Sequence, residues 1–407
     1  MWVCNPLDFY VIIRSRCSLG QNYHWTIGHR KICKHYNKLT TSPWFSGMEV
    51  HEQMDALLLS TLAARIECLK LSLDDEASPL YTFMSLIPGP SPSPHPSLIL
   101  AKSSLSTETI NALFSRFANN NFSVHSHFHT YAHGIFPLAS RLFNHSCVPN
   151  AAAKYVIIPG GSVRMDVVAL RSISAGEEIS LPYIDPALLQ TRSTVFRLTY
   201  GFICYCPSCT VLDAIGEVPE PPRDKAQLNR ISKNLETFVT VHRDQLPLYI
   251  GNIQAFPGSL YCVLHESYLT SVSEMFSNAA HDGSYDVALD TGTTLTALYR
   301  LIYPPNYPQI GLHLLELSKA MWNKIITTNT DDQRFKSQMS TALCEAEQIL
   351  VLILGKEGDE GDGPCKEIKL LKDLLDKEQL SHLNRASTPT PAAIRLALYS
   401  FTRSLRV

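Results

Sequence analysis

The sequence lacks any apolar run long enough to cross a bilayer, and it lacks a strong net charge. Its 407 residues carry 35 Lys and Arg against 37 Asp and Glu, which gives a formal net charge of −2. A membrane-spanning helix needs about 20 mostly apolar residues. Proteins that bind nucleic acid usually carry a strongly basic surface and a recognisable binding motif, whereas this sequence has a mild basic patch at Lys31, Lys34 and Lys38 and no recognition-helix motif. We therefore expect no membrane association and no direct nucleic-acid binding.

The amino-terminal segment also lacks the order of features that marks a secretory signal. A short apolar stretch at 9–13 follows Asp8 and precedes Arg14 and Arg16, whereas a signal places its basic residues first. We therefore expect an intracellular protein, in the nucleus, the cytoplasm or both. In a reducing compartment the eleven cysteines are free thiols or metal ligands rather than a disulfide framework.

Hydrophobic spacing predicts a mixture of helices and strands. Apolar residues recur at three- and four-residue steps across 50–73, which indicates one helix. Strand-like segments at 152–158 and 162–170 flank a Pro-Gly-Gly turn, and a further short strand is expected within 173–183. The Pro- and Ser-rich segment 88–97 cannot hold a helix or a central strand, so it predicts a surface loop or linker.

The chain becomes helical after about residue 217. Ile231, Leu235 and Phe238 share one helical face with His242. Further helices are expected at 336–354, closed by Gly355, and at 366–383. Successive antiparallel pairs of such helices would form a helical-repeat array, although no exact sequence repeat is present.

Three cysteines lie within six residues and form a Cys-x-Cys-x-x-Cys motif: Cys204, Cys206 and Cys209. Three thiolates this close can bind one Zn²⁺, and a closed structural site needs a fourth ligand. Cys147, beside His145, is the best candidate for that ligand. Spacing alone does not distinguish Cys147 from Cys262 or Cys344, and the alternative is a set of unliganded thiols on a turn.

Several motifs occur in the order found in one enzyme family. Residues 138–150 end in Asn-His-Ser-Cys-Val-Pro-Asn, 176–185 contain Gly-Glu-Glu-Ile and then Tyr-Ile-Asp, and 200–209 carry the clustered cysteines. These segments are similar to the NHSCxPN motif, the GEEI…Y motif and the post-SET zinc segment of SET domains. Residues 114–124 and the helical 297–317 resemble further parts of the SET-and-MYND protein-lysine methyltransferases.

The resemblance implies an α+β fold. It comprises a β-rich SET core with a helical insertion before it, a zinc-bound post-SET segment and an all-α C-terminal domain similar to tetratricopeptide (TPR) helix pairs. The expected boundaries are a degenerate MYND-type remnant at 1–36, a helical insertion and Pro/Ser-rich linker at 37–113, the C-terminal half of the SET core at 114–186, the post-SET zinc segment at 187–216 and the TPR-like domain at 217–407.

The resemblance also implies a reaction, the transfer of a methyl group from S-adenosylmethionine to a lysine of a histone or another protein. The cofactor-binding residues that match the family are Asn120, Asn144, His145 and Phe202. The catalytic residues that match are Tyr183, beside the methyl-transfer path, and Tyr200, lining the lysine channel. The zinc ligands that match are Cys147, Cys204, Cys206 and Cys209. Protein partners are expected at the helical domain.

Each assignment has a simpler alternative. Tyr183 could be a half-buried strand tyrosine, Phe202 a core anchor, and Asn144 with His145 a polar turn cap. Glu177 and Glu178 are expected to be structural. Four histidines in 125–133 could bind metal, but a solvated face or a place near the substrate groove is the preferred interpretation.

The amino-terminal part departs from the family. Trp25, His29 and Cys33, together with Cys17 and Gln21, resemble the end of a MYND finger, but the remaining cysteines of both zinc sites are missing. No strand-rich segment with a Gly-x-Gly cofactor loop precedes them. Two hypotheses therefore stand for an N-terminally shortened chain. One is an active lysine methyltransferase, and the other is a catalytically inactive SET-fold scaffold that binds proteins through its helical domain.

Overall fold

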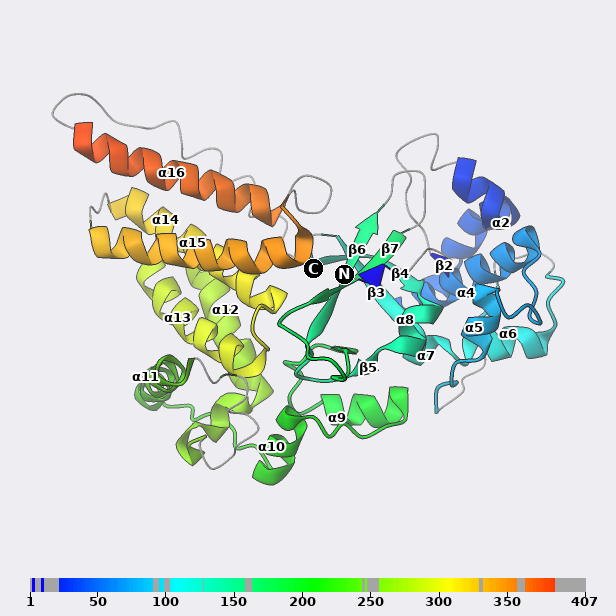
Figure 1. Cartoon of the computed structure of the whole chain (residues 1–407), viewed down its shortest axis with the longest axis horizontal. Helices are drawn as coiled ribbons and strands as arrows, with labels where there is room; N and C mark the ends of the chain where they lie inside the picture. The colour runs from blue at the N-terminus through cyan, green and yellow to red at the C-terminus, as the bar shows by residue number, and fades with distance from the viewer. Residues whose placement is uncertain are drawn as a thin grey trace. The chain divides into compact units, whose positions relative to one another are not determined.

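A computed structural model describes residues 2–3, 9–10, 22–90, 95–98, 103–126, 128–157, 163–243, 246, 256–328, 332–356 and 363–384. The chain divides into two compact units, Met1–Thr210 and Val211–Val407, which Figure 1 colours from blue to green and from green to red. Two features named in the sequence analysis lie outside the described residues: the finger-like Cys17 and Gln21, and the Pro-Gly-Gly turn expected at 159–161.

The first unit begins with a run of helices that precedes most of its strands. They are the π-helical turn η1 (Trp25–His29), α2 (Arg30–Thr40), α3 (Pro43–Ser46), α4 (Val50–Leu69), α5 (Pro79–Met84) and α6 (Thr107–Phe114). Helix α4 starts where its spacing predicts, at a capping box formed by Glu49 and Glu52. It ends four residues earlier than expected because Lys70 adopts the left-handed conformation. Its apolar side chains form a core with α5 and α6.

The strands of the first unit form three small sheets. The strands are β1 (Trp2–Val3), β2 (Phe9–Tyr10), β3 (Asn121–Ser126), β4 (His129–Ile135), β5 (Asn144–His145), β6 (Ala151–Ile157), β7 (Val163–Ala169) and β8 (Ser180–Leu181). The sheet orders are β1-β7-β6, β2-β4-β3 and β5-β8, and only β5 and β8 pair in parallel. Ala151 pairs with Ala169, so the strands predicted at 152–158 and 162–170 are confirmed to within one residue.

The short strand expected within 173–183 is β8, which comprises Ser180 and Leu181. Gly176 has a φ of +85°, which glycine adopts without strain. The Glu177 N–H donates to the Ser174 carbonyl oxygen. These contacts turn the chain before residue 180, so the upstream half of the predicted strand is a loop.

The amino-terminal residues contribute strands that the sequence did not predict. Trp2 pairs with Val167 of β7, and Phe9 pairs with Ile135 of β4. Downstream, the finger-like residues form η1 and α2, where Cys33 is exposed. Within the ranges that the structure describes, no grouping of potential metal ligands forms around that helix.

Short helices lead from the sheets to the clustered cysteines. They are α7 (Phe117–Asn120), α8 (Pro137–Leu142), α9 (Arg192–Val195), the π-helical turn η2 (Phe196–Tyr200) and α10 (Pro207–Ile215). A core of side chains from β3, β4, β6, β7 and α8 lies beneath the β5–β8 pair. This core positions the Asn-His-Ser-Cys segment next to the Tyr183 segment.

Every described element after residue 216 is a helix. These are α11 (Lys225–Val241), the 3₁₀ helix η6 (Gly258–Leu264), α12 (Glu266–Asp282), α13 (Tyr285–Ile302), α14 (Pro308–Thr328), α15 (Gln333–Leu354) and α16 (Pro364–Asn384). From α12 to α16 each helix packs against the next (Figure 1). The helix predicted to end at Gly355 does so. Among the described helices, none combines the length and the apolar character needed to span a membrane.

Candidate functional site

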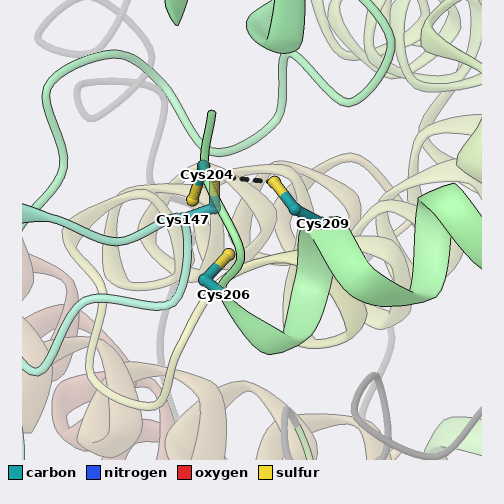
Figure 2. Close-up of side chains that lie close together, drawn as sticks. All are labelled: Cys147, Cys204, Cys206 and Cys209. Carbon is teal, nitrogen blue, oxygen red and sulfur yellow. Dashed lines mark hydrogen bonds between the residues drawn. The ribbon is translucent and has the colours of Figure 1, made fainter. Parts of the chain in front are cut away.

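Four cysteine side chains converge in the first unit. The Sγ atoms of Cys147, Cys204, Cys206 and Cys209 all lie within 4.8 Å of one another, and Figure 2 shows them facing a common space. Cys147 and Cys209 are 3.6 Å apart. Zinc–sulfur bonds of about 2.3 Å in a tetrahedron place sulfurs about 3.8 Å apart, so the donor set fits a structural Zn²⁺. The group contains Cys147 and neither Cys262 nor Cys344.

Local backbone geometry brings three of these thiols together. Gly201 follows η2 with a φ of +74°, a left-handed conformation that favours glycine. The chain then reverses, and the Phe202 N–H donates to the Phe196 carbonyl oxygen. Helix α10 starts at Pro207, whose fixed φ suits a first helical turn, and so places Cys209 beside the preceding cysteines.

The thiols perturb one another electrostatically. A hydrogen bond with Cys147 is the largest of several contacts that lower the pKa of Cys204 far below its usual range. Cys147 likewise lowers the pKa of Cys206 to about 6, whereas the bond to Cys204 raises the pKa of Cys147 itself. The cluster therefore favours thiolate at some of its sulfurs, and thiolate is the form that binds metal.

Arg192 is a buried cation beside the cysteine cluster, with 1% of its surface exposed. Its guanidinium donates to the Pro186 carbonyl oxygen at 2.9 Å and to the Ser208 hydroxyl at 2.7 Å. Ser208 immediately precedes Cys209 in the chain. A buried positive charge is stabilised by nearby negative charge, which thiolates on a metal would supply.

The His145 ring lies between the thiols and the aromatic residues. Its Nε2 atom is 3.2 Å from the Cys147 sulfur, and its Nδ1 atom accepts the Tyr183 N–H at 3.0 Å. The ring centroid lies 4.4 Å from that of Phe196 and 5.3 Å from that of Tyr183. Both ring nitrogens of this predicted cofactor-binding residue are therefore engaged within the protein.

Tyr183, Tyr200 and Phe202 form one aromatic group, as their predicted roles require. The Tyr183 and Tyr200 centroids are 5.2 Å apart, and Phe202 lies 6.1–6.3 Å from both. The Tyr183 hydroxyl donates to the Phe143 carbonyl oxygen at 2.7 Å. The Tyr200 hydroxyl donates to the Tyr183 carbonyl oxygen at 3.4 Å. Each tyrosine hydroxyl is therefore paired with a backbone carbonyl oxygen.

Both tyrosine hydroxyls stay protonated at neutral pH. Burial, and secondarily the neighbouring Tyr183, raises the pKa of Tyr200 to about 12. Burial also raises the pKa of Tyr183, with a further contribution from the negative charge of Glu178. Because neither hydroxyl is a base near pH 7, these groups can orient a partner through hydrogen bonds but are not poised to remove its proton.

The two predicted cofactor-binding asparagines have different surroundings. Asn144 is exposed, and its amide donates to the Glu178 carboxylate at 2.6 Å. Asn120 is 7% exposed, and its amide donates to the Arg116 carbonyl oxygen and to the Asn119 side chain, each at 2.9 Å. Asn120 ends α7, which packs against η2.

Asn150 has a structural role that the sequence reasoning missed. Its buried amide donates to the Glu177 carboxylate at 3.1 Å and to the Glu178 carbonyl oxygen at 2.8 Å, and its oxygen accepts the Ser180 N–H at 2.9 Å. A hydrogen bond from Arg171 is the largest effect that lowers the pKa of Glu177 to about 2. The two glutamates are structural, as expected. The last residue of the Asn-His-Ser-Cys-Val-Pro-Asn motif was the available signal for Asn150.

The clustered histidines do not converge on a metal site where they are described. His125 is half-buried and lies against Tyr155, with ring centroids 6.2 Å apart, and burial lowers the pKa of the half-buried His133. Both described rings are therefore half-buried, and the interpretation as a solvated face or a place near the substrate groove stays a prediction. His127 and the His129 side chain lie outside the described residues.

Parts of the chain are similar to known proteins. Residues 30–184 match the family model described as the SET domain. Human protein-lysine N-trimethyltransferase SMYD5 is 37% identical over 92 residues, which cover 22% of this chain and 20% of that protein. The Arabidopsis thaliana histone-lysine N-methyltransferase ATXR2 is 41% identical over 76 residues, which cover 18% of this chain and 15% of that protein.

A longer match extends over about half of the chain. The Danio rerio N-lysine methyltransferase SMYD2-B is 27% identical over 233 residues, 51% of this chain and 50% of that protein. The matched part spans about a fifth to a quarter of the length of the SMYD5 proteins. The chain therefore matches a SET domain over residues 30–184 and is similar, over part of its length, to SET-and-MYND-type protein-lysine methyltransferases.

Proposed function

We propose that this chain is an S-adenosylmethionine-dependent protein-lysine N-methyltransferase that acts on a lysine of a histone or another protein. One observation carries the proposal. Tyr183, Tyr200 and Phe202, which are separated from His145 by 38–57 positions in the sequence, form one aromatic group around its ring. The same four residue types, in the same order, resemble the active site of the related methyltransferases.

The cofactor would be held where Asn144, His145 and Phe202 meet, with Asn120 approaching from α7. Asn144 is exposed and has an amide oxygen available to a ligand, and Phe202 offers a half-buried aromatic face for adenine. S-adenosylmethionine supplies a positively charged methyl donor when bound. The protein's part is to bind it and to keep the donor in line with the attacking amine.

The lysine amine must be neutral to attack, although its ordinary pKa is about 10.4. A desolvated channel beside a positive charge favours the neutral amine. In the proposed channel the Tyr183 and Tyr200 hydroxyls remain protonated, so their oxygens accept from the amine while their hydrogens stay on backbone carbonyls. The amine would lose its proton before it enters, because no nearby tyrosine can accept it.

A structural zinc on the four thiols would hold the post-SET segment against the aromatic group. Its ligands would be Cys147, Cys204, Cys206 and Cys209. Two observations support this: the four sulfurs lie within 4.8 Å of one another, and Phe202 and Tyr200 pack in the same cluster as the cysteines. The zinc would take no part in the chemical step.

The helical unit would bind protein partners. Its successive packed helices α12 to α16 resemble TPR-like helix pairs, which commonly present extended binding surfaces. We place the protein in the nucleus, the cytoplasm or both, where lysine-bearing substrates occur. The MYND-type remnant is proposed to bind no zinc, because Cys33 is exposed on α2 without a neighbouring set of ligands among the described residues.

A methyl-transfer assay tests the proposal. The zinc-loaded full chain is incubated with core histones or a cell extract and S-adenosylmethionine that carries a labelled methyl group, and labelled sites are identified by mass spectrometry. We expect label on lysine, and its loss in Tyr200→Phe. A folded chain that binds the cofactor but labels no lysine would contradict the proposal and would favour the non-catalytic scaffold.

A further inference from the structure

We propose that His145 is a positioning residue that fastens the Tyr183 backbone to the zinc-binding thiols. One ring nitrogen bonds to the Cys147 sulfur at 3.2 Å, and the other accepts the Tyr183 N–H at 3.0 Å. The inference rests on the proposed zinc site and the proposed methyl transfer. It goes beyond them by assigning the imidazole to a bridge between the metal ligands and the catalytic tyrosine.

The hydrogen-bond geometry assigns the tautomer of the ring. A backbone N–H can only donate, so Nδ1 must accept from Tyr183 and carries no proton. The neutral ring then carries its hydrogen on Nε2, which points at the Cys147 sulfur. The Nε2–H group therefore faces the Cys147 sulfur at 3.2 Å, and a thiolate sulfur on a metal accepts such a bond.

The surrounding aromatic rings keep this bridge in place. The His145 centroid is 4.4 Å from Phe196, which is fully buried, and 5.9 Å from Phe202. Tyr183 is fixed at a second point, because its hydroxyl donates to the Phe143 carbonyl oxygen. The ring therefore connects the Cys147 sulfur to the backbone of Tyr183 through two hydrogen bonds.

Two substitutions of His145 each remove one of its two hydrogen bonds and leave the other. An asparagine amide can take the place of Nδ1 but is too short to reach the sulfurs. A glutamine amide reaches the place of Nε2 but leaves the Tyr183 N–H without its acceptor. Outer-sphere partners of metal ligands typically contribute about 10–100-fold in metal affinity. We expect a loss of that size in His145→Asn and near-normal affinity in His145→Gln.

Measurements on the zinc-loaded full chain test the two contacts of His145 separately, the contact with the Cys147 sulfur and the hydrogen bond from the Tyr183 N–H. Zinc affinity is measured by competition with a chelator, and the cobalt-substituted protein reports the sulfur bonds through its sulfur-to-metal charge-transfer band. Hydrogen–deuterium exchange reports the Tyr183 amide, which is well resolved because Pro182 has none. We expect that amide to exchange at least about tenfold faster in His145→Gln and to keep its protection in His145→Asn. The cobalt band should move to longer wavelength only in His145→Asn.

A half-buried histidine of the same unit supplies the control. His133→Gln should change neither zinc affinity nor exchange at Tyr183. The bridge is overturned if the two His145 variants behave alike, if the Tyr183 amide stays protected in His145→Gln, or if the wild-type chain binds no zinc. A wild-type chain that passes both tests yet transfers no methyl group would contradict the proposed function and leave the bridge standing.

Discussion

Removing one oxygen from Tyr183 should affect methyl transfer much more than folding. The hydroxyl donates to the Phe143 carbonyl oxygen at 2.7 Å. A single intramolecular hydrogen bond contributes about 1 kcal/mol to stability, so Tyr183→Phe should unfold with a free energy lower by about that amount. If the same hydroxyl orients the lysine amine, its loss misplaces the attacking atom, and such misplacement costs about 100-fold in rate.

A rate loss of about 100-fold corresponds to about 2.7 kcal/mol of transition-state stabilisation, more than the expected loss of folding stability. The assay is steady-state methyl transfer at saturating cofactor and substrate, with cofactor affinity measured separately by calorimetry. Affinity should change by less than about threefold, because the hydroxyl orients the amine and does not hold the cofactor.

Tyr155 supplies the matched control, because it is a buried tyrosine of β6 in the same unit. Tyr155→Phe should retain at least about half of the wild-type kcat, since its ring packs in the sheet core beside Phe136. Equal losses in both variants would show that the effect is general loosening of the fold. Full activity in Tyr183→Phe would refute the assigned role.

Three further predictions address the metal, the Asn150 network and the helical unit. Elemental analysis should show that Cys204→Ser has lost its bound zinc. Cys344→Ser, which changes an exposed cysteine, should keep the zinc. An unchanged zinc content in Cys204→Ser would show that Cys204 is not a ligand. Asn150→Ala should lower the free energy of unfolding by about 3 kcal/mol, because it leaves the Ser180 N–H and the Glu178 carbonyl without a partner; a loss below about 1 kcal/mol would refute that role. Burial lowers the pKa of His313 from its ordinary value of 6.5 to about 4. The stability that the folded chain gains from the neutral ring is therefore complete above about pH 6.5 and is lost as the pH falls through 4. Between pH 7 and pH 4 the wild type should therefore lose about 3 kcal/mol more stability than His313→Gln, whose amide can still donate to Gly292; parallel pH profiles would contradict this.

Local patterns predicted the parts of the fold that local physics determines. The strands predicted at 152–158 and 162–170 were found within one residue, because a Pro-Gly-Gly sequence separates two strand-like segments. The helix after Glu49 starts at a capping box whose two residues are three positions apart in sequence. The short strand predicted within 173–183 is confirmed at Ser180 and Leu181, whereas its bounds depend on the turn at Gly176 and on the side chain of a distant residue, Asn150.

The structure brings the four predicted zinc ligands together, whereas the hydrogen bonds among the site's residues could not be predicted from the sequence. The spacing of Cys204, Cys206 and Cys209 indicates a metal site by itself, whereas the choice of Cys147 depends on how β5 returns beside α10. Hydrogen bonds such as that between Asn144 and Glu178, 34 residues apart, depend on tertiary packing. The direction of the His145 ring and the burial of Arg192 depend on the same packing, which no short sequence period encodes.

Binding of S-adenosylmethionine is the most direct test of whether this chain is a methyltransferase. Isothermal titration of S-adenosylmethionine into the zinc-loaded 407-residue chain should give saturable binding with one site, and Asn144→Ala should weaken or abolish it. Asn278→Ala, which changes an exposed amide of α12 in the second unit, should bind as the wild type does. Absence of binding in a folded chain that contains zinc would contradict the methyltransferase account.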